Sequence, residues 1–364
     1  MSARQTYMAD VSLALVNRTG AYYICRDVLQ HLPQFFPQTR YWRLGFMPQQ
    51  TLLRKIAARA MMQELYMMGD SDFLARAHPK DKPVFFMDPL YVLRTELKRE
   101  DIVLVHDVGP VSHADLFPPE VARLYRLAYE KIARVNPGLL TVSDFSYREY
   151  RRLYGTQARF HFNTRLYVRE GIVQDDVSPV AGVNTPFLLT IGALEKRKNH
   201  VRMFEAYRRS GLYAQGVSYV FCGARGYGAD EIMEAARATP GVIALGYVSD
   251  AELRWLFRNA SGMALASLLE GFGLPPLEAA QQGLVSLVSA GGAQEEAVGD
   301  GGILVDPTDT DAIAEGMRQL LALSPEDKAD KLEKCRAHAA TMQMGPYLDM
   351  FARILAANDA PDAR

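Results

Sequence analysis

A chain of 364 residues is about twice the length of a typical domain, so two domains are expected, each large enough for its own core. With a net charge of −1 and 49% hydrophobic residues, the composition excludes any general attraction to nucleic acid. The three cysteines are far apart and lack metal-ligand spacing, which predicts free thiols in a reducing compartment and excludes a zinc site: Cys25, Cys222 and Cys335.

The sequence shows no targeting or spanning segment. Residues 1–15 lack the sustained apolar core of a signal peptide. No apolar run approaches the roughly 18 residues of a spanning helix. These observations predict a cytoplasmic protein, with any membrane contact peripheral and at the inner membrane face.

The first half of the chain alternates short apolar runs with helical patterns. Strands are predicted at 8–15, 84–87, 102–105 and 139–143. Helices are predicted at about 21–32, at 118–135 and after residue 143, where Ser143 and Ser146 are expected to act as caps. The run 102–105 ends at His106 and Asp107. Side chains at the carboxyl end of a strand face the ligand crevice in open α/β folds, so His106 is a candidate for chemistry unless it only hydrogen-bonds locally.

The segment around 52–68 has a helical pattern with two interpretations. One face carries apolar residues, and two cations flank an edge of that face: Leu52, Leu53, Ile56, Ala60 and Met67, with Lys55 and Arg59. Such a helix suits an anionic membrane that carries a lipid-linked acceptor. Met61, Leu65 and Met68 point away from that face, so the later turns are apolar nearly all round. The pattern therefore favours burial within the domain.

The second half alternates strand and helix candidates, which predicts a parallel, doubly wound sheet. The strands are expected at 187–192, 218–223, 242–246, 262–266, 284–289 and 303–305. Residues 171–185 lack periodicity and are the best candidate linker. The expected division is an N-terminal domain at 1–178, a C-terminal domain at 179–345, and a segment at 346–364 that packs back on the first domain.

One stretch of the second half is built like a nucleotide-phosphate site. Residues 264–280 read ALASLLEGFGLPPLEAA, an apolar strand followed by a glycine turn and a helix that begins near Leu274. Glu270 and Glu278 stand eight positions apart, and Gly271 and Gly273 between them let backbone N–H groups approach a ligand. The N-terminus of the helix adds partial positive charge for a phosphate. The alternative is a plain strand, turn and helix.

A cluster of cations follows the first strand of the second half. The segment GALEKRKNH places Lys196, Arg197 and Lys198 before a helix, where they would neutralise a diphosphate leaving group. The alternative is a solvated charge run. Further on, GYVSDAELRWLFRNA has Ser249 and Asp250 as helix caps.

Together these motifs resemble the retaining glycosyltransferases of the GT-B fold, specifically family four. The resemblance implies that Glu270 lies against the sugar of a nucleotide-sugar donor and that Glu278 binds the ribose hydroxyls. It assigns the diphosphate to the backbone of Gly271, Phe272, Gly273 and Leu274, together with Arg197 and Lys198. It also places His106 near the reacting sugar, the Thr19 and Gly20 loop opposite the diphosphate, and Tyr247 and Val248 at the base-binding edge.

The chain departs from the family pattern at two positions. Some members have an Arg where this chain has Ala193, which puts one cationic contact in doubt. Glu295 replaces the Pro of a Pro-Glu pair, and Glu296 is interpreted as structural.

The resemblance implies a GT-B enzyme with two Rossmann-like domains and an interdomain cleft for the donor. It would transfer a hexose with retention, with mannose from GDP-mannose the favoured donor, to a saccharide or lipid-linked acceptor in bacterial surface-polysaccharide synthesis. No metal and no other cofactor are expected. Two alternatives stay open: the same fold using a UDP- or dTDP-sugar, and a catalytically silent nucleotide-sugar-binding subunit.

Overall fold

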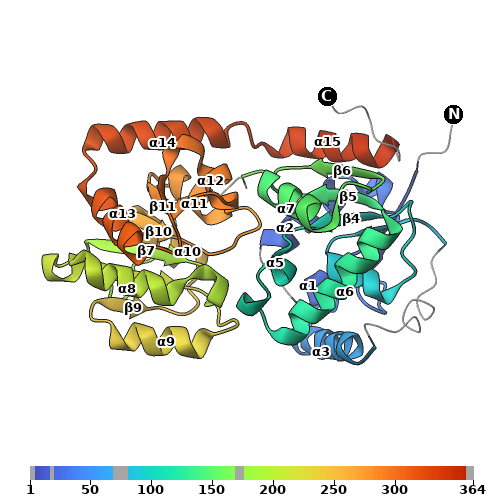
Figure 1. The fold of residues 1–364 in the computed structure, drawn as a ribbon, viewed down its shortest axis with the longest axis horizontal. Coiled ribbons are helices and arrows are strands. Elements are labelled where there is room, and N and C mark those ends of the chain that lie inside the picture. The colour runs from blue at the N-terminus through green and yellow to red at the C-terminus, as the bar shows by residue number, and fades with distance from the viewer. Residues whose placement is uncertain (1–4, 17–19, 69–80, 169–175, 358–364) are drawn as a thin grey trace. The chain divides into compact units, whose positions relative to one another are not determined.

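The computed structural model describes residues 5–16, 20–68, 81–168 and 176–357, and contacts divide the chain into two compact units (Figure 1). Unit 1 comprises residues 1–166 and 344–364, and unit 2 comprises residues 167–343. The boundaries expected from the sequence were 178 and 345. Each unit contains its own six-stranded parallel sheet, so each has its own core.

The sheet of unit 1 has the strand order β2-β1-β3-β4-β5-β6. Its strands are β1 (Met8–Asp10), β2 (Gln38–Arg40), β3 (Val84–Phe86), β4 (Ile102–Val105), β5 (Gly138–Thr141) and β6 (Phe160–Asn163). Every residue of the central strands β3, β4 and β5 is buried. Helices cover both faces of a parallel sheet, which is why these strands are continuous apolar runs in the sequence.

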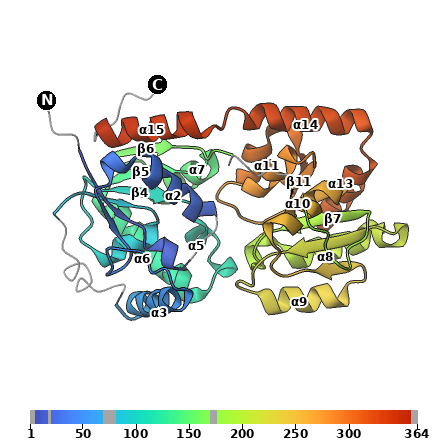
Figure 2. The same ribbon diagram turned by 180° about the vertical axis from the view of Figure 1, so that it is seen from behind.

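The helices of unit 1 include one from the C-terminal end of the chain. They are α1 (Leu13–Val16), α2 (Gly20–His31), α3 (Thr51–Met68), α5 (Gly109–Ser112), α6 (Pro119–Val135), α7 (Asp144–Tyr154) and α15 (Met344–Ala357). Ser143 caps α7 by accepting a hydrogen bond from the N–H of Ser146, which confirms one of the two expected caps. Ser146 lies inside α7 and is not a cap. The ring of Phe351 on α15 packs edge-on against Phe85 of β3, and Figure 2 shows the same helix from behind.

The sheet of unit 2 has the strand order β12-β11-β10-β7-β8-β9. Its strands are β7 (Phe187–Ile191), β8 (Ser218–Cys222), β9 (Val242–Ala244), β10 (Gly262–Leu265), β11 (Ser286–Ser289) and β12 (Ile303–Val305). All six predicted strands exist and are parallel. The doubly wound α/β prediction is therefore confirmed.

Helices pack on both faces of the second sheet. They are α8 (His200–Ser210), α9 (Ala229–Ala238), α10 (Asp250–Asn259), α11 (Leu274–Gln281), α12 (Ala293–Val298), α13 (Thr310–Ala322) and α14 (Pro325–Ala339). Phe204 of α8 and Met317 of α13 belong to one buried apolar cluster, whereas Leu256 of α10 and Ala279 of α11 belong to the other. Ser249 caps α10 in a reciprocal pair with Glu252, as a capping box does.

The sequence-based assignment of unit 1 was wrong at its first strand. β1 ends at Asp10 rather than at Leu15, because the Asp10 carboxylate accepts the N–H of Ser12 at 3.1 Å and turns the chain into α1. The short strands β2 and β6 were also missed. Both lie at the edges of the sheet and carry polar residues, so they lack the apolar run of a buried strand.

The expected burial of the helix at 52–68 was wrong for one face of α3. Met61 and Leu65 are fully buried, but Leu52, Ile56 and Met67 are more than half exposed. The helix is therefore packed on one side and open on the other. No helix within the described ranges has the length and apolar character that crossing a bilayer requires.

Candidate functional site

The candidate site of unit 2 forms where two loops meet at the carboxyl ends of β7 and β10. These strands are hydrogen-bonded neighbours, so the loops that follow them lie side by side. The N–H of Leu268 donates to the carbonyl of Arg197 at 2.8 Å. The side-chain amide of Asn199 donates to the carbonyl of Ala266 at 2.9 Å. These bonds fix the cation-bearing turn η4 (Lys196–Lys198) against the loop that carries Glu270.

Glu270 is the centre of this arrangement. Arg197 Nη1 lies 2.8 Å from Glu270 Oε2, and Lys198 Nζ forms an ion pair with Oε1. Ser267 Oγ donates to the same Oε1 at 3.0 Å. Burial alone would raise the pKa of Glu270, but the cations of Lys198 and Arg197 outweigh burial and lower the pKa to about 2. The carboxylate is therefore charged near pH 7.

Lys198 reaches Glu270 because Gly192 leaves room for its side chain. Gly192 directly follows β7 and has φ +147°, and a Cβ at this position would lie 3.2 Å from Lys198 Cε and 3.3 Å from Nζ. Lys198 itself is 7% exposed. A buried ammonium needs a charged partner, and Glu270 supplies it.

Arg197 lies between two carboxylates. Its Nε is 2.7 Å from Glu195 Oε2, while its Nη1 faces Glu270. The two cations Arg197 and Lys198 and the two carboxylates Glu195 and Glu270 therefore balance each other.

Sequence reasoning missed the residues behind Glu270. The carbonyl of Ser267 accepts the Ser289 hydroxyl at 2.5 Å, and the backbone N–H of Ser289 donates to Gln294 Oε1 at 3.3 Å. All three side chains are buried. The available signal was Ser267 itself, a polar residue inside an otherwise apolar run.

The glycine turn after Glu270 has the close backbone packing that its sequence indicates. Gly273 has φ +128° and precedes α11, and a Cβ here would lie 3.2 Å from Gln294 Cα. Phe272 is buried, which anchors the turn from inside. Leu274 begins α11, and the N-cap makes no side-chain hydrogen bond. Glu278 lies half-buried on the second turn of α11.

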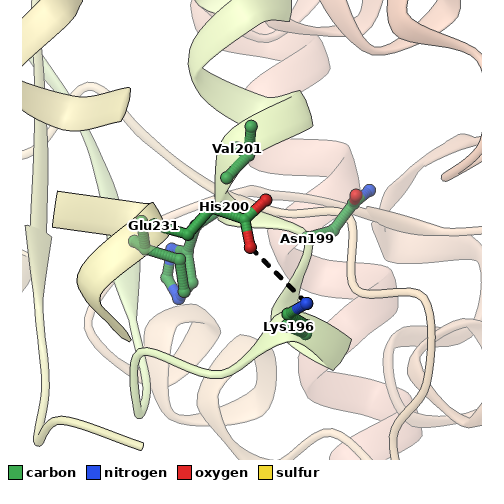
Figure 3. A pocket seen from close by; sticks show the side chains of 6 residues that line it. Lys196, Asn199, His200, Val201 and Glu231 are labelled. Carbon is green, nitrogen blue, oxygen red and sulfur yellow. Dashed lines mark ion pairs between the residues drawn. The ribbon is translucent and has the colours of Figure 1, made fainter. Parts of the chain in front are cut away.

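The predicted cation cluster is divided in the structure. Lys196 turns away from Glu270 and pairs with Glu231 of α9 at 3.5 Å, beside a pocket of about 180 Å³ (Figure 3). His200 lines this pocket, and its Nε2 lies 3.3 Å from the carbonyl of Ala193. Burial lowers the pKa of His200 to about 4, so its ring is neutral near pH 7. Lys196 therefore contributes to another part of the surface.

His106 lies in unit 1 directly after β4. Its Nε2 is 2.8 Å from the carbonyl of Met87, and because a carbonyl only accepts, Nε2 carries the proton. The Ser146 hydroxyl donates to the backbone carbonyl of His106 at 3.2 Å. The ring is partly exposed and held in one orientation. This observation fits both local hydrogen bonding and the orientation of a catalytic ring.

The remaining predicted site residues belong to elements other than those that carry Glu270 and its partners. Gly20 is the first residue of α2 in unit 1, whereas Thr19 lies outside the described residues. Tyr247 is 84% exposed in the loop between β9 and α10. Val248 packs partly against the apolar cluster under α10. Their proposed roles toward the diphosphate and the base stay predictions.

Sequence comparison identifies a family match within unit 2 and relatives of the chain. Residues 174–340 match the family described as Glycosyl transferases group 1. Over 251 residues the chain is 28% identical to the O-antigen chain mannosyltransferase B of Escherichia coli, covering 66% of each protein. A stretch of 109 residues is 31% identical to the serotype-specific mannosyltransferase WbdA of Escherichia coli, covering 28% of this chain and 13% of that protein.

Structure comparison identifies the fold. The α,α-trehalose-phosphate synthase (UDP-forming) from Burkholderia vietnamiensis matches with a TM-score of 0.60 at 14% identity, covering 93% of this chain and 82% of that one. At this identity the likeness concerns the fold alone, and it confirms the expected GT-B class.

Proposed function

We propose a function on the premise that the chain is a GT-B glycosyltransferase with a group 1 domain at residues 174–340. The chain moves a hexose with retention from a nucleotide sugar to a saccharide or lipid-linked acceptor. The reaction serves surface-polysaccharide synthesis, in the cytoplasm and at the inner membrane face. Mannose from GDP-mannose is the favoured donor, which agrees with the mannosyltransferase name of the Escherichia coli relative.

The observation that carries this proposal is the grouping of Glu270 with Arg197 and Lys198 next to a glycine turn and a helix N-terminus. A diphosphate is bound by cations and backbone N–H groups. Arg197 and Lys198 supply the cations, and the glycine turn that leads into α11 supplies the backbone N–H groups. A carboxylate among those cations suits the sugar end of the donor, as the family resemblance implies for Glu270.

The proposed transfer changes two bonds at the anomeric carbon of the sugar and places negative charge on the leaving diphosphate. The bond between the anomeric carbon and the diphosphate oxygen breaks, and the leaving diphosphate keeps the electron pair. A new bond forms from the acceptor oxygen to the anomeric carbon, and the proton of that hydroxyl passes to the oxygen of the departing diphosphate. Negative charge grows on the leaving group, so Arg197, Lys198 and the N-terminus of α11 stabilise the transition state more than the ground state. Glu270 and His106 are assigned to the sugar, Glu278 to the ribose.

A thermal-shift and calorimetry series with GDP, UDP, dTDP and their sugars tests the donor. Free ligand at about a hundred times its dissociation constant stabilises the folded state by about 2.7 kcal/mol. We expect GDP and GDP-mannose to bind most tightly. Tighter binding of a UDP- or dTDP-sugar would show that the donor is not GDP-mannose. The assignment of the reaction as glycosyl transfer would not change.

Slow hydrolysis of the bound donor without acceptor separates an enzyme from a silent binding subunit. We expect release of free hexose, and its α configuration at the moment of release would support retention. Tight binding of a nucleotide sugar with no hydrolysis and no transfer to any saccharide or lipid-linked acceptor would favour the silent subunit.

A further inference from the structure

One face of α3 exposes large apolar side chains that the fold of unit 1 does not use. Leu52 is 69% exposed, Leu53 51%, Ile56 53% and Met67 72%. The opposite side of the helix is already anchored, because Met61 and Leu65 are fully buried. The exposed residues are therefore not a core face that awaits packing within the described part of unit 1.

The inner side of α3 is held by neighbouring elements. α3 contacts α1 and α6, and Arg123 of α6 donates to the carbonyl of Tyr66 at 2.9 Å. In Figures 1 and 2 the helix lies along the edge of unit 1 that is remote from α15. A helix anchored in this way presents its outer face without needing to move.

Cations border this apolar face. At 100° per residue, Lys55 and Arg59 lie one turn apart along the edge of the face beside Leu52 and Ile56. Both are exposed, and within the described residues neither forms an ion pair. The acid of α3, Glu64, lies at the border of this face beside Leu53, but its side chain is only 9% exposed, pairs with Arg43 at 2.6 Å and accepts the Trp42 indole N–H. The exposed face is therefore apolar and cationic, because the one acid of α3 is covered and paired.

We propose that the α3 face, formed by Leu52, Leu53, Lys55, Ile56, Arg59 and Met67, docks on an anionic lipid bilayer. An interfacial helix lies in the membrane plane with its apolar side chains between the headgroups and its flanking cations against anionic lipid. This pattern of charge and exposure matches that chemistry. A second copy docking through the same face would bring the cations of both helices together, which disfavours a symmetric dimer.

This proposal goes beyond glycosyl transfer and does not depend on it, because vesicle binding is measured without donor or acceptor. The full chain is floated with vesicles of neutral phosphatidylcholine and with vesicles in which part of that lipid is replaced by anionic phosphatidylglycerol. Two variants test the two components: Leu52→Ser with Ile56→Ser removes apolar area, and Lys55→Gln with Arg59→Gln removes charge. Leu304→Ser with Arg237→Gln, at exposed positions of unit 2, is the matched control.

We expect the wild type to bind anionic vesicles well above neutral ones. The double Gln variant should bind anionic vesicles about 25-fold more weakly, since each cation near such a surface is worth about fivefold. The double Ser variant should bind at least about tenfold more weakly. The control should bind as the wild type does, and all melting temperatures should agree.

Three outcomes would overturn the proposal. One is the absence of wild-type binding to anionic vesicles. Another is equal binding by the wild type and both α3 variants. The third is a wild-type dimer in sedimentation that the α3 variants dissociate, which would make the face a contact between copies. Loss of donor hydrolysis with vesicle binding retained would affect the proposed function and leave this inference standing.

Discussion

Arg197 Nη1 lies 2.8 Å from Glu270 Oε2, although 73 positions separate the two residues in sequence. The family resemblance predicts that Arg197 and Lys198 bind the diphosphate and that Glu270 contacts the sugar. In the structure Glu270 pairs with both cations, and Arg197 also pairs with Glu195. A diphosphate must therefore compete with carboxylates for the same cations. This competition makes specific predictions.

The first prediction concerns the Glu270 charge. Glu270→Gln should lower donor turnover at least about a hundredfold, because the sugar loses a preorganised charge. Affinity for the free nucleoside diphosphate should stay equal or rise, because the variant frees Arg197 and Lys198. Steady-state kinetics and calorimetry measure both. Glu195→Gln is the control, since it also releases Arg197 and should change turnover far less.

The second prediction separates two neighbouring lysines. Lys198→Ala should lower kcat more than it raises KM, because a cation beside the diphosphate gains most as the leaving group separates. Lys196→Ala should have nearly wild-type kinetics, because Lys196 pairs with Glu231 instead. Melting temperatures measured beside the kinetics distinguish the roles. A lower melting temperature with unchanged kcat in Lys198→Ala would make Lys198 a structural cation.

The third prediction tests the ribose assignment of Glu278. Glu278→Ala should weaken binding of the nucleoside diphosphate about tenfold or more, because hydrogen bonds to a charged carboxylate are lost. Binding of inorganic pyrophosphate, which has no ribose, should not change. Calorimetry with both ligands gives the comparison. Equal weakening of both would move Glu278 to the phosphates, and unchanged nucleotide affinity would remove its role.

The fourth prediction concerns His106. His106→Ala should reduce turnover at least about a hundredfold while free-nucleotide affinity stays near wild type, because its assigned partner is the sugar. His31→Ala, on the last turn of α2, is the control. Near wild-type turnover in the His106 variant would leave this residue with only its hydrogen bond to Met87.

The fifth prediction concerns His161 of unit 1, a partly exposed histidine whose two ring nitrogens are buried. Burial, with a smaller effect of Arg151, lowers the pKa of His161 to about 3. The unfolded chain then binds this proton first, so the free energy of unfolding falls as the pH drops from about 6.5 toward 3. His161 packs against the rings of Tyr147 and Tyr150, and neither ring nitrogen has a hydrogen-bond partner within the described residues.

His161→Phe should therefore fit the site and reduce this pH dependence. Urea midpoints at pH 7.5 and pH 5 should differ less in the variant than in the wild type. Parallel pH profiles in the two proteins would show that His161 does not contribute to acid sensitivity.

Local patterns in the sequence determined much of unit 2. Buried parallel strands are uninterrupted apolar runs, so all six of its strands could be recognised. Helix caps were equally readable, because Ser143 and Ser249 act on N–H groups three residues away. The glycine turn after Glu270 also belongs to this class. In each case the signal and the structure it predicts lie within a few residues of each other.

Only the tertiary structure decided which distant residues meet. The pairing of Glu270 with Arg197 and Lys198 depends on β7 lying beside β10, and the strand order arises from packing across the whole sheet. The exposure of Leu52 and Ile56 depends on which face of α3 its neighbours cover, and periodicity alone does not reveal this. Apolar periodicity marks a face that avoids water, while only the assembled fold determines whether protein covers that face.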